Sequence, residues 1–269
     1  MLIVVKVGGR IAKDIASSEL VQDLKNLLSE NKVVIVHGGG DEVTEVASKL
    51  GKEQKFVVSP EGFRSRYTDK ETAEIYTMVI AGKINKQIVS IFQSGGIPAI
   101  GLSGLDGSLI RANRKKKIII VDEAGRKRVI DGGYTGKISE VNTHPIRLLI
   151  ESGYVPVIAP VALGEEYEPL NVDADRAAAH VAGNLKADKL VLLTDVEGLM
   201  LDNQKVPKLT LSEVEKVLPK IGPGMITKVY AAMEAVNMGV SEALIAYGLG
   251  EFPISSALKH ECGTVITRE

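Results

Sequence analysis

The chain has 269 residues, of which 45% are hydrophobic and 25% are charged, and this ordinary balance excludes a disordered or fibrous protein. The formal net charge is -1, so the molecule as a whole does not attract nucleic acid or an anionic membrane. The length suits one large α/β domain or two lobes that share a sheet.

Short runs of aliphatic and β-branched residues recur along the chain. They are apolar throughout rather than alternating, which is typical of strands buried on both faces of a parallel sheet that helices cover. The predicted strands are residues 2–7, 33–36, 98–101, 155–159, 189–193 and 243–246.

Segments with helical spacing separate these strands. The first begins with Ser17 as an N-cap and places Leu20, Leu24 and Leu27 on one face. The predicted helices are residues 17–29, 41–50, 69–94, 144–152, 173–186, 210–218 and 226–238. This alternation predicts an α/β fold, a three-layer αβα sandwich around a mainly parallel sheet. Residues 108–137 are the exception, because their strand-like pieces predict a hairpin.

Three glycine-rich turns each follow a predicted strand, at residues 6–10, 37–41 and 101–107. Glycine lets backbone N–H groups approach an anion, and ligands of open α/β sheets bind at the carboxyl ends of strands. The turns therefore predict a phosphate or carboxylate cradle, although tight turns without a ligand would give the same pattern. Neither a Walker A motif nor GxGxxG is present.

Charged residues also stand where a bound anion would explain them. Lys6 ends a buried strand, where a lysine either meets an anion or extends to the surface. Lys228 falls in the first turn of a predicted helix, where the helix dipole disfavours a cation unless a polyanion binds; the alternative is an exposed helical lysine. Asp173 and Asp175 open another helix, and they either cap it or hold lysines around a phosphate.

Five motifs, in this order, make the chain similar to the amino-acid kinase family. They are Lys6-Val-Gly-Gly9, Val36-His-Gly-Gly-Gly40, Asn171-Val-Asp-Ala-Asp175, Thr194-Asp-Val-Glu-Gly198 and Gly224-Met-Ile-Thr-Lys228. The resemblance implies that residues 1–165 form a lobe for acceptor binding and dimerisation and that 166–269 form an ATP-binding lobe. Proline, glycine and acidic residues cluster at the expected boundary, 160–169.

Several segments differ from the N-acetylglutamate kinases of this family. Residues 62–69 replace a simpler motif, Asp173 stands where those enzymes usually have asparagine, and 101–107 and 133–136 differ too. These segments resemble the kinases that phosphorylate 2-aminoadipate or glutamate linked to an amino-group carrier protein, in lysine and arginine biosynthesis. N-acetylglutamate kinase is the nearest alternative, and a non-catalytic amino-acid sensor on the same fold is an alternative of another class.

The resemblance implies roles for the motif residues. Lys6 and Lys228 would flank the transferring phosphoryl group, and Asp175 would orient both lysines. The acceptor would be bound by Gly39, Gly40, Arg64 and Asn171, with Arg64 pairing with its α-carboxylate. ATP would be bound by Gly8, Gly9, Thr194, Asp195, Gly224 and Met225. Mg²⁺ would be held mainly by the nucleotide phosphates, and the four histidines have no metal-ligand spacing, so no protein metal site is expected.

A strong positive charge lies in the predicted hairpin. Between residues 111 and 137 there are nine basic and three acidic residues, a formal excess of six positive charges. The charge either keeps a solvated hairpin soluble or, as the resemblance implies, docks a small acidic carrier protein through Lys115, Lys116 and Lys117. Arg64 and Arg66 are expected to extend this surface. A nucleic-acid partner is disfavoured by the near-neutral net charge and the lack of a binding motif.

The sequence also supports predictions about oligomeric state and cellular compartment. We expect a homodimer joined by the 69–94 helix, on which Ile75, Met78 and Val79 share a stripe. We also expect a cytoplasmic protein without a membrane partner. The chain starts without a signal-peptide pattern, contains no run of ~18 apolar residues, and has one cysteine, Cys262, which cannot form an intrachain disulfide.

Overall fold

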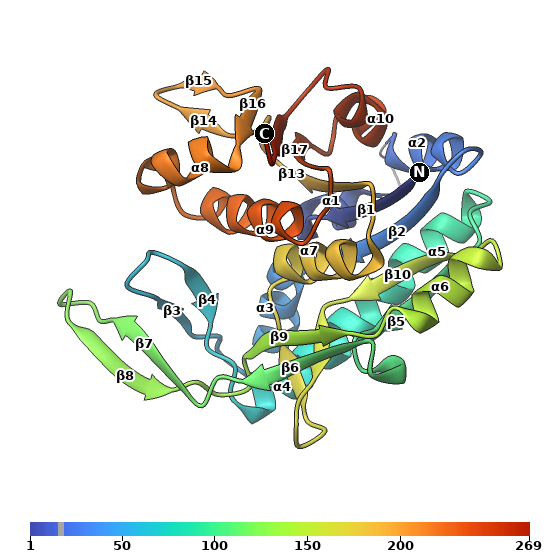
Figure 1. Ribbon diagram of the computed structural model, residues 1–269. Coiled ribbons are helices and arrows are strands. Elements are labelled where there is room, and N and C mark those ends of the chain that lie inside the picture. Colours follow the sequence, from blue (N-terminus) through green and yellow to red (C-terminus); the bar gives the residue numbers. More distant parts are fainter. Residues whose placement is uncertain (16–18) are drawn as a thin grey trace.

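An eight-stranded sheet forms the centre of the protein, shown in Figure 1 as a computed structural model whose described residues are 1–15 and 19–269. The strand order is β16 (Lys208–Thr210), β18 (Thr264–Thr267), β17 (Glu242–Tyr247), β13 (Lys189–Thr194), β1 (Leu2–Val7), β2 (Lys32–His37), β10 (Val155–Ala159) and β5 (Ala99–Ser103). Every neighbouring pair is parallel except β17 and β18. All six predicted strands are confirmed. The apolar pattern does not predict β16 and β18, whose three and four residues are too short for a clear signal.

Helices cover both faces of this sheet, which confirms the three-layer sandwich. One face is covered by α6 (His144–Glu151), α7 (Ala174–Leu185), α8 (Leu211–Val217) and α9 (Met225–Asn237). The other is covered by α1 (Gly9–Asp14), α2 (Leu20–Leu27), α3 (Gly40–Lys49), α4 (Lys70–Thr77), α5 (Asn85–Ser94) and α10 (Pro253–Leu258). Side chains of β1 alternate between the two cores, because Val4 packs in the first and Ile3 and Val5 pack in the second.

The predicted helices agree with the structure to within a few residues. The predicted N-cap Ser17 lies outside the described residues, and α2 begins at Leu20. The predicted 69–94 helix is interrupted by a π-helical turn, η2 (Met78–Ile84), between α4 and α5. π-turns insert one extra residue per turn and rotate the side chains that follow. Here the turn brings Asn85 toward the end of β2.

The predicted dimerisation stripe on this helix is wrong in part. Ile75 and Val79 are buried in the protein's own core, whereas Met78 is 57% exposed. Spacing of three and four residues identifies a helix face, but it does not tell whether that face meets the core or a partner.

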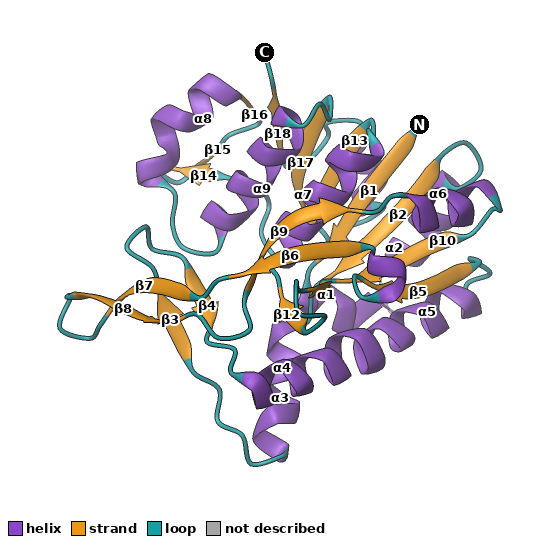
Figure 2. Ribbon diagram, turned by 60° about the horizontal axis from the view of Figure 1, so that its bottom comes forward, coloured by secondary structure: helices purple, strands orange, loops and turns teal. Residues whose placement is uncertain are grey.

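Smaller sheets extend from the main body. β6 (Ile110–Arg114) and β9 (Gly136–Val141) pair beside β11 (Val161–Leu163) and β12 (Pro169–Asn171). They lead into the projecting hairpin of β7 (Lys117–Val121) and β8 (Lys127–Asp131), which lies beside β3 (Phe56–Val58) and β4 (Arg64–Arg66) in Figure 2. The predicted hairpin is therefore confirmed. The remaining short elements are η3 (Asp106–Ser108), β14 (Met200–Leu201), β15 (Gln204–Lys205) and η4 (Leu218–Lys220).

The main sheet divides by sequence between β13 and β1. Strands β1, β2, β10 and β5 all precede residue 160, and β13, β17, β18 and β16 all follow residue 188. The carboxyl ends of β1, β2 and β13 lie next to one another at this division. Within residues 1–15 and 19–269, no helix has the length and apolar character needed to cross a membrane.

Candidate active site

A cleft of about 1420 Å³ opens at the carboxyl ends of β1, β2 and β13. Loops converge at this edge of a parallel sheet, and ligands bind there. The turns after β1 and β2 line one part, and residues at the starts of α7 and α9 line another. The predicted site residues that line it are Lys6, Gly8, Gly9, Gly39, Gly40, Arg64, Lys115, Asn171, Asp175, Thr194, Asp195, Gly224 and Lys228.

Asp175 brings the two predicted catalytic lysines together. Its Oδ1 lies 2.7 Å from Lys6 Nζ, and its Oδ2 lies 3.2 Å from Lys228 Nζ. The three residues come from β1, α7 and α9, so the fold rather than the local sequence assembles them. Lys6 and Asp175 are both buried. Two positive charges against one negative charge leave the group with a net positive charge, which suits an incoming anion.

The lysines also determine the ionisation of Asp175. Burial by itself would raise its pKa, but the ammonium groups of Lys6 and Lys228 outweigh burial and hold the pKa of Asp175 below its ordinary value. The neighbouring Asp173 keeps some contact with solvent. The protein atoms around it in the cleft nevertheless reduce its hydration, and this desolvation and the negative charge of Asp175 both raise the pKa of Asp173. Asp173 caps α7 by accepting a hydrogen bond from the Arg176 N–H at 2.9 Å. Of the two predicted roles, Asp173 therefore caps and Asp175 pairs with lysines.

The first two glycine turns lie back to back beside these charges. A side chain on Gly9 would come within 2.9 Å of the Gly39 backbone, so the turns approach more closely than other residues allow. Gly39 has a φ of 150°, which favours glycine, and it precedes the first turn of α3. The N–H groups of that first turn have no helical acceptor. The turns thus bring backbone N–H groups and the positive end of a helix dipole to one point.

The third glycine turn does not join this cradle, contrary to the sequence prediction. No residue of 101–107 is among those that line the cleft in the part of the chain the structure describes. Ser103 closes the turn by donating two hydrogen bonds to Asp106 Oδ2, from its backbone N–H at 2.6 Å and from its Oγ at 2.8 Å. A side chain on Gly104 would lie 2.3 Å from the Val161 carbonyl oxygen, so this glycine serves close packing.

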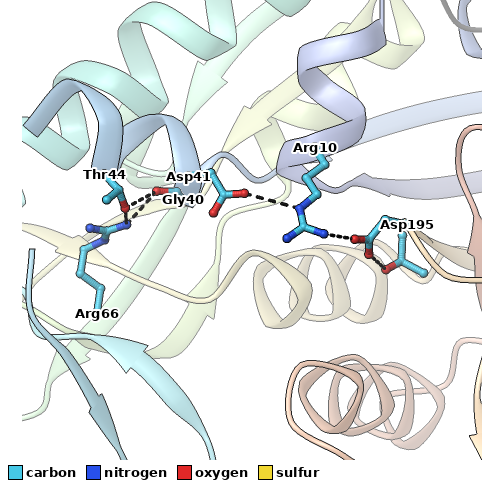
Figure 3. A network of polar contacts seen from close by, with 7 residues as sticks. Arg10, Gly40, Asp41, Thr44, Arg66 and Asp195 are labelled. Atoms are coloured by element: carbon cyan, nitrogen blue, oxygen red, sulfur yellow. Dashed lines mark hydrogen bonds and ion pairs between the residues drawn. The ribbon is translucent and has the colours of Figure 1, made fainter. Parts of the chain in front are cut away.

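Arg66, rather than Arg64, contacts the second glycine turn. Its guanidinium donates to the Gly40 carbonyl oxygen at 2.7 Å and to Thr44 Oγ1 at 2.9 Å, as Figure 3 shows. Arg66 is 8% exposed, so the prediction that it extends an outer docking surface is wrong. Arg64 is exposed and lies over the Phe56 ring, 3.9 Å from its centroid, while still lining the cleft.

Arg10 links the turns to the end of β13, and the sequence assigns it no role. Its guanidinium forms an ion pair with Asp195 and lies 3.7 Å from an Asp41 carboxylate oxygen. Asp195 in turn accepts a hydrogen bond from Thr194 Oγ1 at 3.2 Å. Only the three-dimensional structure reveals this bridge, because its members come from three separate turns.

The remaining residues predicted to bind the acceptor or ATP differ in whether they reach the cleft. Asn171 ends β12 and donates from Nδ2 to Thr68 Oγ1 at 2.9 Å, which orients its amide beside the cleft. Gly224 is the N-cap of α9, with a φ of 84°, and lines the cleft. Met225 instead packs against the hydrophobic core.

The three hairpin lysines are all exposed, but they differ in whether they also line the cleft. Lys115 lines the cleft, where burial and the charge of Arg176 lower its pKa. Lys116 and Lys117 are exposed at the base of the projecting hairpin. Isoleucines 118, 119 and 120 of the same strand also line the cleft. The hairpin therefore forms one wall of the cleft.

Carboxylates of the described residues line the cleft, but they are not grouped around one point. In residues 1–15 and 19–269 no group of three or more His, Cys, Asp or Glu side chains is arranged to hold a metal ion.

Comparison with known proteins identifies the family of this chain. A model of the amino acid kinase family matches residues 1–247. This chain belongs to the amino acid kinase family. A relative from Sulfolobus acidocaldarius, named LysW-aminoadipate/LysW-glutamate kinase, is 48% identical over 266 residues, covering 98% of this chain and 100% of its own. A relative from Nitrosopumilus maritimus carries that name in provisional form and is 56% identical over 268 residues, all of both chains.

A solved amino acid kinase fold shows the same architecture. Carbamate kinase from Giardia lamblia, bound to AMP-PNP, superposes with a TM-score of 0.69 at 17% identity, covering 100% of this chain and 98% of that one. At this identity the likeness shows the fold alone. The predicted family and fold are confirmed, and the roles of individual site residues remain predictions.

Proposed function

We propose that this chain transfers the γ-phosphoryl group of ATP to the side-chain carboxylate of 2-aminoadipate or glutamate linked to a carrier protein. The product would be an acyl phosphate for lysine or arginine biosynthesis. The observation that supports this best is the pairing of Lys6 and Lys228 with one buried carboxylate, Asp175, beside two glycine turns. The names of the full-length relatives support the choice of substrate.

The chemistry requires two anions to meet. A carboxylate acceptor is ionised at neutral pH, so its oxygen attacks the γ-phosphorus without a general base while the bond to the β,γ-bridging oxygen breaks. Negative charge then accumulates on the leaving ADP and on the transferring group. Lys6 and Lys228 would neutralise that charge, and Asp175 would keep both ammonium groups in place.

The two halves of the sheet suggest where each substrate binds. The acceptor would bind on the side of residues 1–165, against Gly39, Gly40, Arg64 and Asn171. Arg66 is a further candidate, because its guanidinium already lies beside Gly40. ATP would bind on the side of residues 166–269, near Thr194, Asp195 and Gly224, with Gly8 and Gly9 at its phosphates.

Mg²⁺ would accompany the nucleotide. We expect the ion to be held mainly by phosphate oxygens of the nucleotide. Bound there, it would neutralise phosphate charge during transfer. The free, half-buried Cys262 suits a reducing compartment, so we place the enzyme in the cytoplasm.

One assay set tests the proposal. Purified protein with ATP and Mg²⁺ is offered carrier-linked aminoadipate, carrier-linked glutamate and free N-acetylglutamate, and hydroxylamine traps the acyl phosphate. We expect turnover with one or both carrier-linked substrates. Turnover of acetylglutamate alone would identify an N-acetylglutamate kinase. Binding without turnover of any acceptor would favour a non-catalytic sensor.

We also propose a homodimer, although two of the three residues in the stripe predicted to form its interface, Ile75 and Val79, are buried in the protein's own core. Met78 is the one residue of that stripe left exposed, at 57%. Light scattering tests this assembly. A mass near 28.8 kDa at working concentration would identify a monomer instead.

A further inference from the structure

His37 is a buried histidine at the start of the second glycine turn. It is the last residue of β2, and its exposed fraction is zero. Its Nδ1 lies 3.0 Å from the carbonyl oxygen of Gly38, and its Nε2 lies 3.1 Å from Nδ2 of Asn85. The ring is therefore held on both sides by hydrogen bonds, one of which goes to the turn itself.

Asn85 determines which ring nitrogen of His37 carries the proton. Asn85 Nδ2 lies 2.9 Å from the Val157 carbonyl oxygen and 3.3 Å from that of Leu102. These carbonyl oxygens only accept, so the Asn85 group that faces them and His37 Nε2 is the NH₂, which only donates; Nε2 is therefore the accepting ring nitrogen, and Nδ1 faces the Gly38 carbonyl oxygen as the donor. A neutral imidazole has one proton, which is then on Nδ1 and is donated to Gly38.

The environment keeps this ring neutral. Burial, helped by the charges of Lys86 and Lys6, outweighs the hydrogen bond to Gly38, which raises the pKa, and lowers the pKa of His37 to about 4. A second ring proton would also point at the Asn85 amide hydrogens. The Nδ1–H form is consequently the form present at neutral pH.

The hydrogen bond to Gly38 orients the next peptide group. The described chain has no cis peptide bond, so the Gly38 C=O and the Gly39 N–H belong to one trans peptide and point in opposite directions. With the carbonyl turned toward the buried ring, the N–H points to the other side, and Gly39 lines the cleft. Among the described residues, no acceptor is paired with this N–H.

We propose that His37 is a positioning residue, whose Nδ1–H fixes the Gly38–Gly39 peptide so that the Gly39 N–H points at an oxygen of the reacting anions. The nature of that anion rests on the proposed kinase function. Asn85 follows the π-helical turn and holds the ring, while Ile84 of the same turn lies against Gly39. The π-helical turn and the residue after it therefore pack against the second glycine turn, through Ile84 and Asn85.

The tautomer is tested on the unmodified protein, without any substrate. Long-range ¹H–¹⁵N spectra of the histidine-labelled chain distinguish Nδ1–H from Nε2–H rings, and loss of one ring's signals in His37→Asn assigns them. We expect a neutral Nδ1–H ring at pH 7. An Nε2–H or charged ring would overturn the proposal. The NMR measurement does not depend on kinase activity. The role of His37 and the kinase function can therefore be refuted independently of each other.

Two substitutions of similar severity test the effect on catalysis. The amide of His37→Asn lies near the Nδ1 position and can still donate to Gly38, whereas the longer His37→Gln places its amide near Nε2 and cannot. We expect His37→Gln to lower kcat about 100-fold with both KM values little changed, and His37→Asn to stay within about tenfold of wild type. Thermal unfolding of both variants measures the shared packing loss. Equal kcat losses at equal stability would overturn the positioning role.

Discussion

Lys6 and Asp175 form a buried ion pair, with 2.7 Å between Nζ and Oδ1 and side chains that are 7% and 6% exposed. The pair joins the end of β1 to the start of α7 across the division of the main sheet. Lys228 shares the same carboxylate from α9, so one aspartate places two cations at the glycine turns.

Removing either positive charge should slow phosphoryl transfer. Lys6→Met and Lys228→Met keep most of the side-chain volume but lose the charge, and each should lower kcat about 10²–10³-fold, the scale of losing one electrostatic donor. Steady-state kinetics with a carrier-linked acceptor measure the change. The exposed Lys32, at the opposite end of β2, provides the control as Lys32→Met. Near-wild-type kcat in both site variants would disprove their catalytic role.

Neutralising Asp175 should destabilise the protein in a way that ATP repairs. Asp175→Asn leaves two neighbouring ammonium groups without their counter-charge, and breaking a buried pair costs about 3–5 kcal/mol. A bound polyanion would supply the missing negative charge. We therefore expect a lower melting temperature than wild type and a larger upward shift on adding ATP, measured by thermal unfolding with and without nucleotide. An equal ATP shift in the two proteins would contradict this account.

The contact between the glycine turns should not tolerate a methyl group. In Gly9→Ala the new Cβ would meet the Gly39 backbone at 2.9 Å, and backbone cannot move aside as a side chain can. The two turns would separate, so activity should fall about 100-fold, the cost of a displacement near 1 Å. Gly82→Ala is a matched control, since its Cβ would meet nothing within 4 Å. Equal activity of the two variants would show that the turns need not touch.

The sequence predicted the parallel strands and the glycine turns because both depend on local patterns. The runs around Val4 and Val34 are apolar enough to identify buried strands by themselves. The sequence predicts the wrong place for Arg66 and no role for Arg10, because their partners Gly40 and Asp195 come from other turns. A motif gives residue types in order, whereas the distance between two motifs depends on how the sheet is ordered.

Acid should weaken the fold through His37. The unfolded histidine binds a proton near pH 6.5, whereas the folded one does so only near pH 4. Between these values the unfolded state holds more protons, so stability falls as pH drops from 6.5 to 4, by about 3 kcal/mol from this group. Urea unfolding at pH 7, 5.5 and 4 measures the loss, and His37→Gln should flatten the profile over that window. An unchanged pH dependence in the variant would place the acid sensitivity elsewhere.

The basic hairpin should dock the acidic carrier protein to which, as we propose, the substrate is linked. Lys116 and Lys117 are exposed on the hairpin, while Lys115 lines the cleft, so the two kinds of lysine have separable effects. The double variant Lys116→Glu/Lys117→Glu should raise KM for the carrier-linked substrate without changing KM for ATP. Long-range attraction speeds association and is screened over ~10 Å at 0.1 M salt.

Salt and a matched variant separate docking from a general loss of charge. Added salt should weaken carrier binding to wild type strongly and to the double variant less, because fewer charges remain to be screened. Lys32→Glu/Lys259→Glu changes the net charge equally at two exposed positions, the start of β2 and the end of α10, and Figure 1 shows both elements away from the hairpin. This control should keep the wild-type KM for the carrier. If both double variants raise KM alike at low salt, net charge alone explains the effect. If the hairpin variant uses the carrier as well as wild type does, the hairpin is only a solvated wall of the cleft.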